Sequence, residues 1–312
     1  MGKILVTGQS GLIGSQFKGD IVSLNSMVCD LRNQKETNEI IESYTDTNIQ
    51  GPKDVVDKII HCAAKVGGVG HNMNHKGEFF YDNIMMNSNI IEAARKYGIK
   101  KMVIFLSTCI FPDDVEYPLT EKKIHIGPPH ESNDGYAYSK RMAAVHLKAY
   151  REQYGLNYTS VIPCNVYGIN DNFNLESGHV IPSLIHKCYL ARENGTDFEV
   201  WGSGTPLREF IYSKDVAELT IWVLENYDEE EPIILSTSKE ISIKDLVHMI
   251  GNLMNFKGRY KWLSDKPDGQ YRKPSDNSKL LSYLPDYKFT PIENGLKETI
   301  EWFEKNYPNI RK

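Results

Sequence analysis

A glycine-rich turn near the start of the chain constrains its fold more than any other feature. The apolar segment at residues 3–6 (KILV) has the character of a β-strand and leads into a turn that contains Gly8, Gly11 and Gly14. Glycine permits tight turns and close backbone approach, and a helix that begins there offers unpaired N–H groups and a positive dipole end to a pyrophosphate. Because the turn follows a first strand, we interpret it as a nucleotide-phosphate site, in preference to a turn without a ligand.

Predicted strands alternate with predicted helices through the first half of the chain. We expect strands at residues 3–6, 21–24, 59–62, 102–107 and 158–163, and helices at 83–97 and 137–154. This alternation predicts an α/β fold, with a Rossmann-type doubly wound parallel sheet covered by helices on both faces. Small residues after the third of these strands, Ala63 and Ala64, would let an adenosine diphosphate lie across the carboxyl ends of the strands.

The sequence changes character after residue 165. Glycine, asparagine, aspartate and proline are dense from 168 to 182, and a helix is expected at 181–194. A chain of 312 residues is long enough for two lobes. We therefore expect a nucleotide-binding Rossmann domain at 1–165, to which residues 209–232 return, and a smaller α/β substrate-binding domain at 166–312.

Tyr136 and Lys140 are four residues apart at the start of a predicted helix. This spacing puts the phenol and the ammonium on one face, where the cation favours phenolate and readies Tyr136 to exchange a proton with a carbonyl oxygen. The alternative is that Tyr136 packs in a core while Lys140 extends into solvent. The pair alone does not decide between the two, and the neighbouring motifs favour the catalytic interpretation.

Ser107 and Cys109 are two residues apart in the segment FLSTCIFP. In an extended segment this spacing aims both side chains to one side. A reductase needs a hydrogen-bond donor that holds the carbonyl oxygen and a proton donor. Hydride transfer by itself does not require a thiol. Cys109 therefore suggests acid–base chemistry beyond reduction, although a cysteine near a strand end is more often a small buried apolar residue.

Together these motifs resemble the extended short-chain dehydrogenase/reductase family, with TGxxGxxG at 7–14, a strand-end serine, and Tyr-x-x-x-Lys at 136–140. Within that family, the similarity to GDP-L-fucose synthases covers nearly the whole chain and includes the segments 107–112, 127–130, 171–182 and 200–210. The resemblance implies conversion of GDP-4-keto-6-deoxy-D-mannose to GDP-L-fucose. That reaction proceeds by epimerisation at C3 and C5, followed by reduction at C4 with NADPH.

The resemblance also implies roles for individual side chains. Cys109 would be the base and His179 the acid that invert C3 and C5, whose C–H bonds are made acidic by the C4 ketone. Ser107 and Tyr136 would hold the enolate oxygen. Tyr136 would then protonate the C4 oxygen, while Lys140 polarises the phenol and binds the nicotinamide ribose. Outside such a context, a loop histidine like His179 is more often a surface residue.

Binding residues are implied in the same way. The cofactor residues are Gly8, Gln9, Ser10, Gly11, Leu12, Ile13, Gly14, Asp30, Leu31, Ala63, Ala64, Leu106, Ser107, Thr108, Tyr136, Lys140, Pro163, Asn165, Val166 and His179. The GDP-sugar residues are Lys187, Trp201, Arg208, Asp268 and Lys273. Arginine and lysine suit the charge of a diphosphate, and tryptophan provides an apolar wall.

The choice of NADP(H) over NADH depends mainly on the resemblance. Residues 25–26, after the second predicted strand, carry neither an acid for a ribose diol nor an arginine for a 2′-phosphate. Asp30 and Leu31 look like the pair that relatives place beside adenine. Lys18, Ser26 and Arg32 are the candidates for the contact with the extra phosphate.

The composition fits a soluble cytoplasmic enzyme. A net charge of −5 gives no sign of nucleic-acid binding. Five cysteines without a Cys-x-x-Cys motif favour a reducing compartment, and no histidine and cysteine spacing predicts a metal site. The chain enters its first strand at residue 3 and has no long apolar run, so we expect neither a leader nor a membrane span.

Two other functions stay open at this point. One is a nucleotide-sugar reductase or 4-epimerase that uses Ser107, Tyr136 and Lys140 without inverting C3 and C5; Cys109 and His179 distinguish it from the first interpretation. The other is an NADP-sensing binding protein, which would need the phosphate site but no proton donor.

From the resemblance, and from the mixed apolar faces of the predicted helices at 83–97 and 137–154, we also expect a homodimer.

Overall fold

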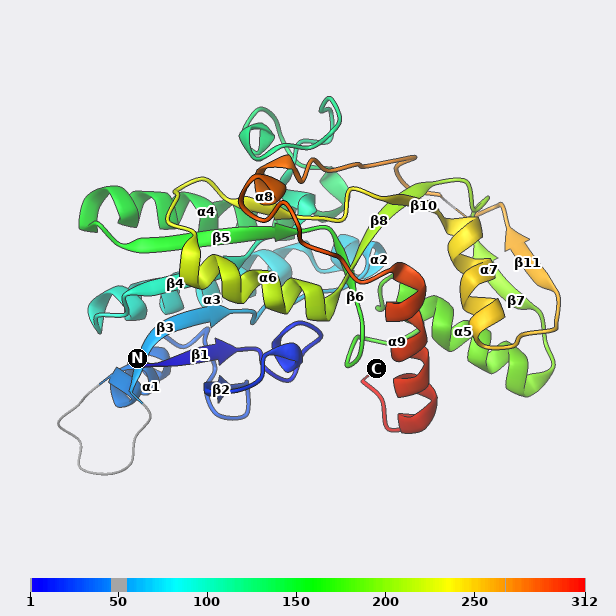
Figure 1. Cartoon of the computed structure of the whole chain (residues 1–312), viewed down its shortest axis with the longest axis horizontal. Helices are drawn as coiled ribbons and strands as arrows, with labels where there is room; N and C mark the ends of the chain where they lie inside the picture. Colours follow the sequence, from blue (N-terminus) through cyan, green and yellow to red (C-terminus); the bar gives the residue numbers. More distant parts are fainter. Residues whose placement is uncertain (1, 46–54, 267, 312) are drawn as a thin grey trace.

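The computed structural model describes residues 2–45, 55–266 and 268–311, and a six-stranded sheet lies at its centre (Figure 1). The strands are β1 (Lys3–Thr7), β2 (Ile21–Leu24), β3 (Val56–His61), β4 (Lys101–Phe105), β5 (Asn157–Pro163) and β9 (Ile233–Leu235). All neighbouring strands are parallel, in the order β2-β1-β3-β4-β5-β9. Most of their valine and isoleucine side chains are fully buried, as expected for a parallel sheet covered on both faces. The direction of winding changes between β1 and β3, where ligands of such sheets bind at the carboxyl ends of the strands.

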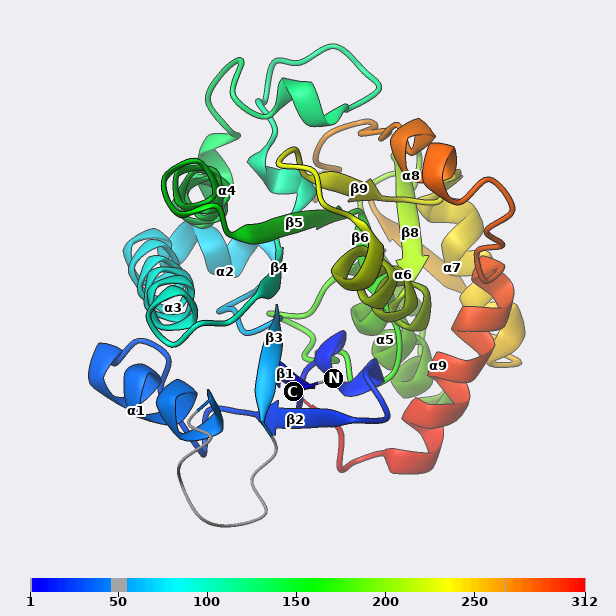
Figure 2. The same cartoon turned by 60° about the vertical axis from the view of Figure 1, so that its left-hand side comes forward.

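Long helices cover both faces of this sheet (Figure 2). On one face lie α1 (Gln34–Thr45), α3 (Lys76–Lys96) and α4 (Asp134–Tyr154), and on the other lies α6 (Ser213–Asn226). The first face buries Ile90 and Leu147, and the second buries Val216. The predicted α/β fold with a doubly wound parallel sheet is confirmed.

The remaining larger elements form a second, smaller assembly. It contains a three-stranded sheet of order β10-β8-β6 and a parallel pair of β11 and β7. Its strands and helices are β6 (Asn165–Tyr167), β7 (Phe198–Trp201), β8 (Leu207–Tyr212), β10 (Glu240–Ser242), β11 (Tyr260–Leu263), α5 (Val180–Asn194), α7 (Ile243–Leu253) and α9 (Ile292–Asn306). Its core is rich in aromatic side chains, and Phe173, Phe198 and Phe303 are completely buried in it.

Short helices connect these elements. They are α2 (Val69–Asn74), α8 (Ser278–Tyr283) and the 3-10 helices η1 (Gly14–Gln16), η2 (Thr108–Ile110), η3 (Glu121–Lys123) and η4 (Glu131–Asn133). No helix in the described part of the chain has both the length and the apolar character needed to cross a membrane.

Two local predictions are wrong. The helix expected after the glycine-rich turn is only η1, because the chain must reach β2 within a few residues. The segment that carries Ser107 and Cys109 is not extended, because β4 ends at Phe105 and the Ser107 side chain caps the η2 turn.

In the segment 209–232, α6 packs on the large sheet, whereas β8 pairs with β6 and β10.

Candidate active site

The glycine-rich turn between β1 and η1 is tightly folded. Gly8 has a φ of +66°, and a Cβ there would lie 2.8 Å from the nitrogen of Ala63. A Cβ on Gly14 would lie 2.7 Å from the Cα of Gln9. A side chain at either position would displace backbone, so the turn depends on both glycines. The open cradle that results fits a group that main-chain atoms approach closely, such as the pyrophosphate of a dinucleotide.

One continuous cleft, about 1940 Å³ in volume, extends from this cradle to the smaller assembly. All the predicted cofactor residues line it except Gln9 and Lys140. Lys140 is buried and only 2% exposed. The other catalytic candidates also line the cleft, namely Ser107, Cys109, Tyr136 and His179.

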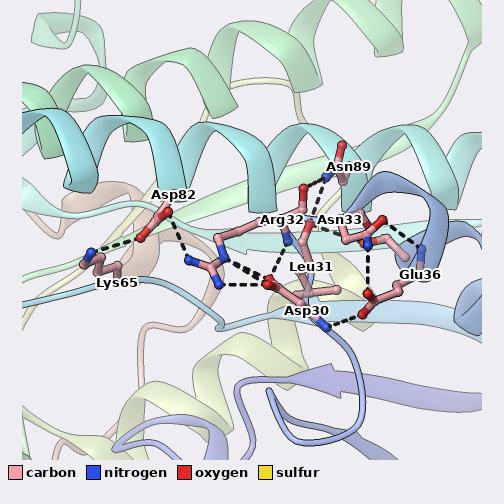
Figure 3. Close-up of polar contacts among 9 residues, drawn as sticks. Asp30, Leu31, Arg32, Asn33, Glu36, Lys65, Asp82 and Asn89 are labelled. Atoms are coloured by element: carbon pink, nitrogen blue, oxygen red, sulfur yellow. Dashed lines mark hydrogen bonds and ion pairs between the residues drawn. The ribbon is translucent and has the colours of Figure 1, made fainter.

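A network of charged side chains borders the cleft beyond the end of β2 (Figure 3). Arg32 donates from Nη2 to Asp30 at 2.8 Å, and its Nη1 lies 3.3 Å from Asp82. Lys65 contacts the same Asp82 at 3.0 Å and Glu78 at 2.7 Å. The hydrogen bond from Arg32 is the main cause of the lowered pKa of Asp30. Arg32, a candidate for the 2′-phosphate, therefore already binds two carboxylates.

The structure places only part of the predicted 2′-phosphate candidates at the cleft. Ser26 lines the cleft, whereas Lys18 is not among its lining residues. The carbonyl of Leu31 accepts a hydrogen bond of 2.9 Å from Nδ2 of Asn89 on α3, which fixes the backbone beside Asp30 (Figure 3). Arg32 and Ser26 are thus the two candidates that the structure leaves beside the cleft.

Ser107 and Cys109 lie at the carboxyl end of β4. The Ser107 hydroxyl oxygen accepts a hydrogen bond of 3.4 Å from the Cys109 nitrogen, which holds the two residues together in the turn. Burial raises the pKa of the Cys109 thiol, and the Ser107 hydroxyl and the charges of Lys273 and Lys140 act in the opposite direction. These two lysines are the charges that favour the thiolate.

Tyr136 and Lys140 occupy the first turns of α4, as their spacing predicts. Lys140 Nζ lies 5.8 Å from the centre of the Tyr136 ring and donates a hydrogen bond of 2.8 Å to the carbonyl of Phe105. Burial lowers the pKa of Lys140 to about 8. Burial and the charge of Cys109 raise the pKa of Tyr136. Burial therefore favours the protonated phenol of Tyr136, which suits a proton donor. The predicted effect of Lys140 on the phenolate stays a prediction.

His179 is the N-cap residue of α5 and reaches the cleft from the smaller assembly. Burial lowers the pKa of its imidazole, and the charge of Arg311 adds to this effect. A lowered pKa makes the imidazolium a stronger acid but reduces its population at neutral pH.

Four of the five predicted GDP-sugar residues line the part of the cleft beside the smaller assembly: Trp201, Arg208, Asp268 and Lys273. Burial lowers the pKa values of Arg208 and Lys273. Neither cation forms an ion pair with the residues that the structure describes, so both charges are available to an anionic ligand.

The fifth residue, Lys187, is not among the lining residues. Its Nζ lies 4.9 Å from the ring centre of Trp201, which does line the cleft, so Lys187 lies beside the predicted nucleotide contacts. The carboxylate of Asp268 accepts hydrogen bonds of 2.7 Å from both the nitrogen and the hydroxyl of Ser203. These bonds fix the loop beside Trp201.

Sequence reasoning missed some charged residues of the cleft, namely Lys65, Asp82, Asp171 and Arg311. Asp171 lies in one of the segments of family similarity, so a signal for it existed. The other three carry no motif, because their place in the cleft depends on contacts between distant parts of the chain. Among the described residues, no group of three or more histidine, cysteine, aspartate or glutamate side chains could hold a metal ion.

The glycine cradle, the strand-end serine and the Tyr136–Lys140 pair define a dinucleotide-dependent oxidoreductase of the short-chain type. Residues 4–236 match the model of the NAD dependent epimerase/dehydratase family. The chain belongs to this family. It is 46% identical to the GDP-L-fucose synthase of Dictyostelium discoideum, in an alignment that covers 99% of this chain and 97% of that protein.

Two further relatives agree with this result. The chain is 42% identical to a probable GDP-L-fucose synthase of Drosophila melanogaster, with both chains covered in full. The crystal structure of a GDP-L-fucose synthetase from Naegleria fowleri bound to NADP superposes with a TM-score of 0.92 at 45% identity, and the match covers 100% of this chain and 95% of that chain. The predicted relationship to GDP-L-fucose synthases is confirmed.

Proposed function

We propose that the protein is a GDP-L-fucose synthase, which epimerises GDP-4-keto-6-deoxy-D-mannose at C3 and C5 and reduces it at C4 with NADPH. The observation that carries this proposal is the position of Cys109 beside Ser107, Tyr136 and Lys140, in the cleft that begins at the glycine cradle. A reductase needs only the serine, the tyrosine and the lysine. The thiol and His179 are the additional acid–base groups that inversion requires.

Inversion begins with removal of a proton from a carbon next to the C4 ketone. Cys109, as thiolate, takes the proton, and the electron pair of the broken C–H bond moves to the C4 oxygen. Ser107 and Tyr136 donate hydrogen bonds to this enolate oxygen. His179 then returns a proton to the opposite face of the same carbon. The thiol then loses its proton to solvent and His179 gains one from solvent, so the same acid–base pair can act in turn on C3 and C5, which both lie next to the ketone.

Reduction uses the same hydrogen-bond donors to the C4 oxygen, Ser107 and Tyr136. When NADP(H) is bound along the glycine cradle, it supplies the hydride for C4. Tyr136 donates its proton to the C4 oxygen, and its raised pKa keeps the phenol protonated until then. Lys140, held by the Phe105 carbonyl, stabilises the negative charge that the proton leaves on Tyr136.

The two ends of the cleft suit the two nucleotides. The glycine cradle would hold the cofactor pyrophosphate, with Asp30 and Leu31 beside the adenine. Arg208 and Lys273, which form no ion pair within the described residues, would bind the diphosphate of the GDP-sugar. Trp201 and Asp268 would contact the rest of the nucleotide, and Lys187 would act through Trp201.

We assign cofactor binding to residues 1–165 together with 209–232, and binding of the GDP-sugar to residues 166–312. We also assign the protein to the cytoplasm and expect it to form a homodimer through α3 and α4. Support for the dimer comes from Tyr138, Met142 and Val145, which are 38%, 42% and 43% exposed. They lie at helical spacing on α4 and form an apolar stripe.

The role of Cys109 is tested by incubating the protein with GDP-4-keto-6-deoxy-D-mannose and NADPH in deuterium oxide, and by determining the product by NMR. The unsubstituted protein should yield GDP-L-fucose with deuterium at C3 and C5. Cys109→Ser should lose both the deuterium and the inverted configuration, while NADPH is still oxidised. Cys62→Ser is the matched control, because Cys62 lines the same cleft but has no assigned role.

Two outcomes would contradict the proposal. Unchanged deuterium incorporation and stereochemistry in Cys109→Ser would identify a reductase or 4-epimerase that does not need the thiol. If the unsubstituted protein oxidised no NADPH with any 4-keto nucleotide sugar, the NADP-sensing alternative would be favoured.

A further inference from the structure

The last described residue of the chain lies at the dinucleotide end of the cleft. Nη1 of Arg311 lies 3.7 Å from the position that a Cβ on Gly11 would occupy. Arg311 also lines the cleft together with Gly11 and His179. Figures 1 and 2 both place the C-terminal tail after α9 close to the carboxyl end of β1. The guanidinium therefore faces the turn that forms the phosphate cradle.

Other cations near this end of the cleft are already paired. Arg32 binds Asp30, Lys65 binds Asp82, and Lys76 lies 3.3 Å from Asp134. The guanidinium of Arg311, in contrast, forms no hydrogen bond or ion pair within residues 2–45, 55–266 and 268–311. Its charge acts on the buried carboxyl of Asp171 and opposes the rise in the pKa of that group, but no hydrogen bond or ion pair with a described residue occupies its donors. These donors are therefore suited to an anionic ligand.

The η1 helix that follows the glycine turn is short, so it supplies little positive potential to a bound pyrophosphate. In many dinucleotide sites, the aligned peptides of a long helix after the glycine turn supply positive potential to the pyrophosphate. Here that helix is the three residues Gly14–Gln16, so few peptide dipoles are aligned. A positive charge placed over Gly11 would compensate for the missing helix.

The tail is also tied to the segment that carries His179. The nitrogen of Phe173 donates a hydrogen bond of 2.9 Å to the backbone carbonyl of Arg311. Phe173 is completely buried in the core of the smaller assembly and stacks on Trp302 of α9. The backbone of Arg311 is thus anchored on a rigid core, while its side chain reaches the cradle of the large sheet.

We propose that Arg311 is a further cofactor-binding residue, whose guanidinium clamps the pyrophosphate of the dinucleotide onto the turn at Gly11. Through its backbone bond to Phe173, the clamp links occupancy of the cofactor site to the order of residues 171–179, which lead to His179. This inference rests on the proposed function only in requiring a dinucleotide cofactor.

Binding measurements test the clamp without any need for turnover. Calorimetric titrations of the full-length protein with NADP⁺, NAD⁺ and GDP are compared for the unsubstituted protein, Arg311→Ala and Arg311→Lys. Arg311→Ala should raise the Kd values for NADP⁺ and NAD⁺ by the same factor, about tenfold, and leave the Kd for GDP unchanged. Arg311→Lys should recover part of the affinity, because it keeps the charge but not the fork of donors. Lys305→Ala is the matched control, since it removes an exposed cation of α9 that does not line the cleft.

A second readout tests the link to residues 171–179. Hydrogen exchange of this segment should slow when NADP⁺ is added to the unsubstituted protein and to Lys305→Ala, but not when it is added to Arg311→Ala at saturating NADP⁺. Equal slowing in Arg311→Ala would overturn the link.

The affinity results can also overturn the clamp itself. Equal Kd values for NADP⁺ in Arg311→Ala and the unsubstituted protein would exclude it. An effect on NADP⁺ without an effect on NAD⁺ would assign the guanidinium to the 2′-phosphate, and an effect on GDP alone would assign it to the sugar nucleotide. If Arg311→Ala did not fold, Arg311→Lys would decide by the same comparison. Failure of GDP-L-fucose formation with intact cofactor binding would count against the proposed function and not against the clamp.

Discussion

The ammonium of Lys140 donates a hydrogen bond of 2.8 Å to the main-chain carbonyl of Phe105, the last residue of β4. This bond joins the first turns of α4, with Tyr136, to the strand end that carries Ser107 and Cys109. It is buried, so water does not compete with it. Lys140 is therefore both a charge beside the phenol and a link between the two elements that hold the catalytic groups.

The rate of C4 reduction is expected to fall as the pH rises through about 8. Burial lowers the pKa of Lys140 to about 8, so the side chain is a cation below this pH and neutral above it. The raised pKa of Tyr136 keeps the phenol protonated over the same interval. Single-turnover oxidation of NADPH, measured from about pH 6 to about pH 10, should show the fall. Lys140→Met should be about 100-fold slower or more, and its rate should not fall at alkaline pH. An alkaline fall that persists in Lys140→Met would contradict the assignment of this pKa to Lys140.

Asp171→Asn is expected to stabilise the protein more at alkaline than at acid pH. Asp171 is buried, and its Oδ2 has no hydrogen-bond partner among the described residues. Burial raises its pKa from 3.8 to about 7. Between these two values the folded protein retains a proton that the unfolded chain has released, so the contribution of this group to stability falls as the pH rises.

Asparagine at position 171 is neutral at every pH, so the variant does not lose stability through this side chain as the pH rises. The gain in the free energy of unfolding should be about 2 to 3 kcal/mol larger at about pH 8 than at about pH 5, as measured by urea denaturation. The exposed Asp286→Asn carries the same change of charge without burial and is the control. An equal gain at both pH values would show that Asp171 is not protonated in the folded protein.

Arg32→Ala is expected to reduce the preference for NADPH over NADH. Arg32 borders the cleft beyond β2 and is held by Asp30 and Asp82, so a 2′-phosphate would compete with these carboxylates for its donors. Steady-state kinetics should show a KM for NADPH that rises by about tenfold, with little change for NADH. Arg95→Ala removes an arginine that is paired with Glu92 outside the cleft, and it should change neither value. An equal rise for both cofactors would mean that Arg32 supports the adenosine pocket and does not read the phosphate.

Gly14→Ala is expected to weaken cofactor binding and stability together. A methyl group at Gly14 would overlap the backbone at Gly8 and Gln9, so the cradle would have to open. Gly77→Ala in α3 is the control, because a Cβ there meets nothing within 4 Å and alanine favours the helix by up to about 1 kcal/mol. Thermal unfolding and titration with NADP⁺ measure the two effects. Normal NADP⁺ affinity in Gly14→Ala would show that the tight turn is not required for binding.

Replacing Met142 and Val145 together by aspartate is expected to dissociate the proposed homodimer. Both side chains belong to the apolar stripe on α4, and two buried carboxylates would oppose its pairing with a second copy. Light scattering at micromolar concentration should give the mass of a dimer for the unsubstituted protein and of a monomer for the double variant. Ile126→Asp, at a 65% exposed position outside α3 and α4, is the control. A monomeric unsubstituted protein would refute the prediction.

The parts of this protein that sequence reasoning predicted correctly depend on local pattern. The glycine spacing after residues 3–6 predicted the cradle, and the spacing of Tyr136 and Lys140 predicted their shared helical face, because a few consecutive residues determine both. Alternating apolar segments likewise predicted the parallel sheet. The length of η1 was not predictable in this way, because it depends on how soon the chain must enter β2.

The pKa shifts and the ion pairs of the site depend on the tertiary structure. The spacing of Tyr136 and Lys140 predicted their shared helical face, whereas the rise in the pKa of the phenol comes from burial by distant segments. Arg32 meets Asp82, fifty positions away in the chain, and Arg311 reaches Gly11 from the other end of the sequence. Such contacts carry no sequence motif, because desolvation and charge pairing depend on which segments the completed fold brings together.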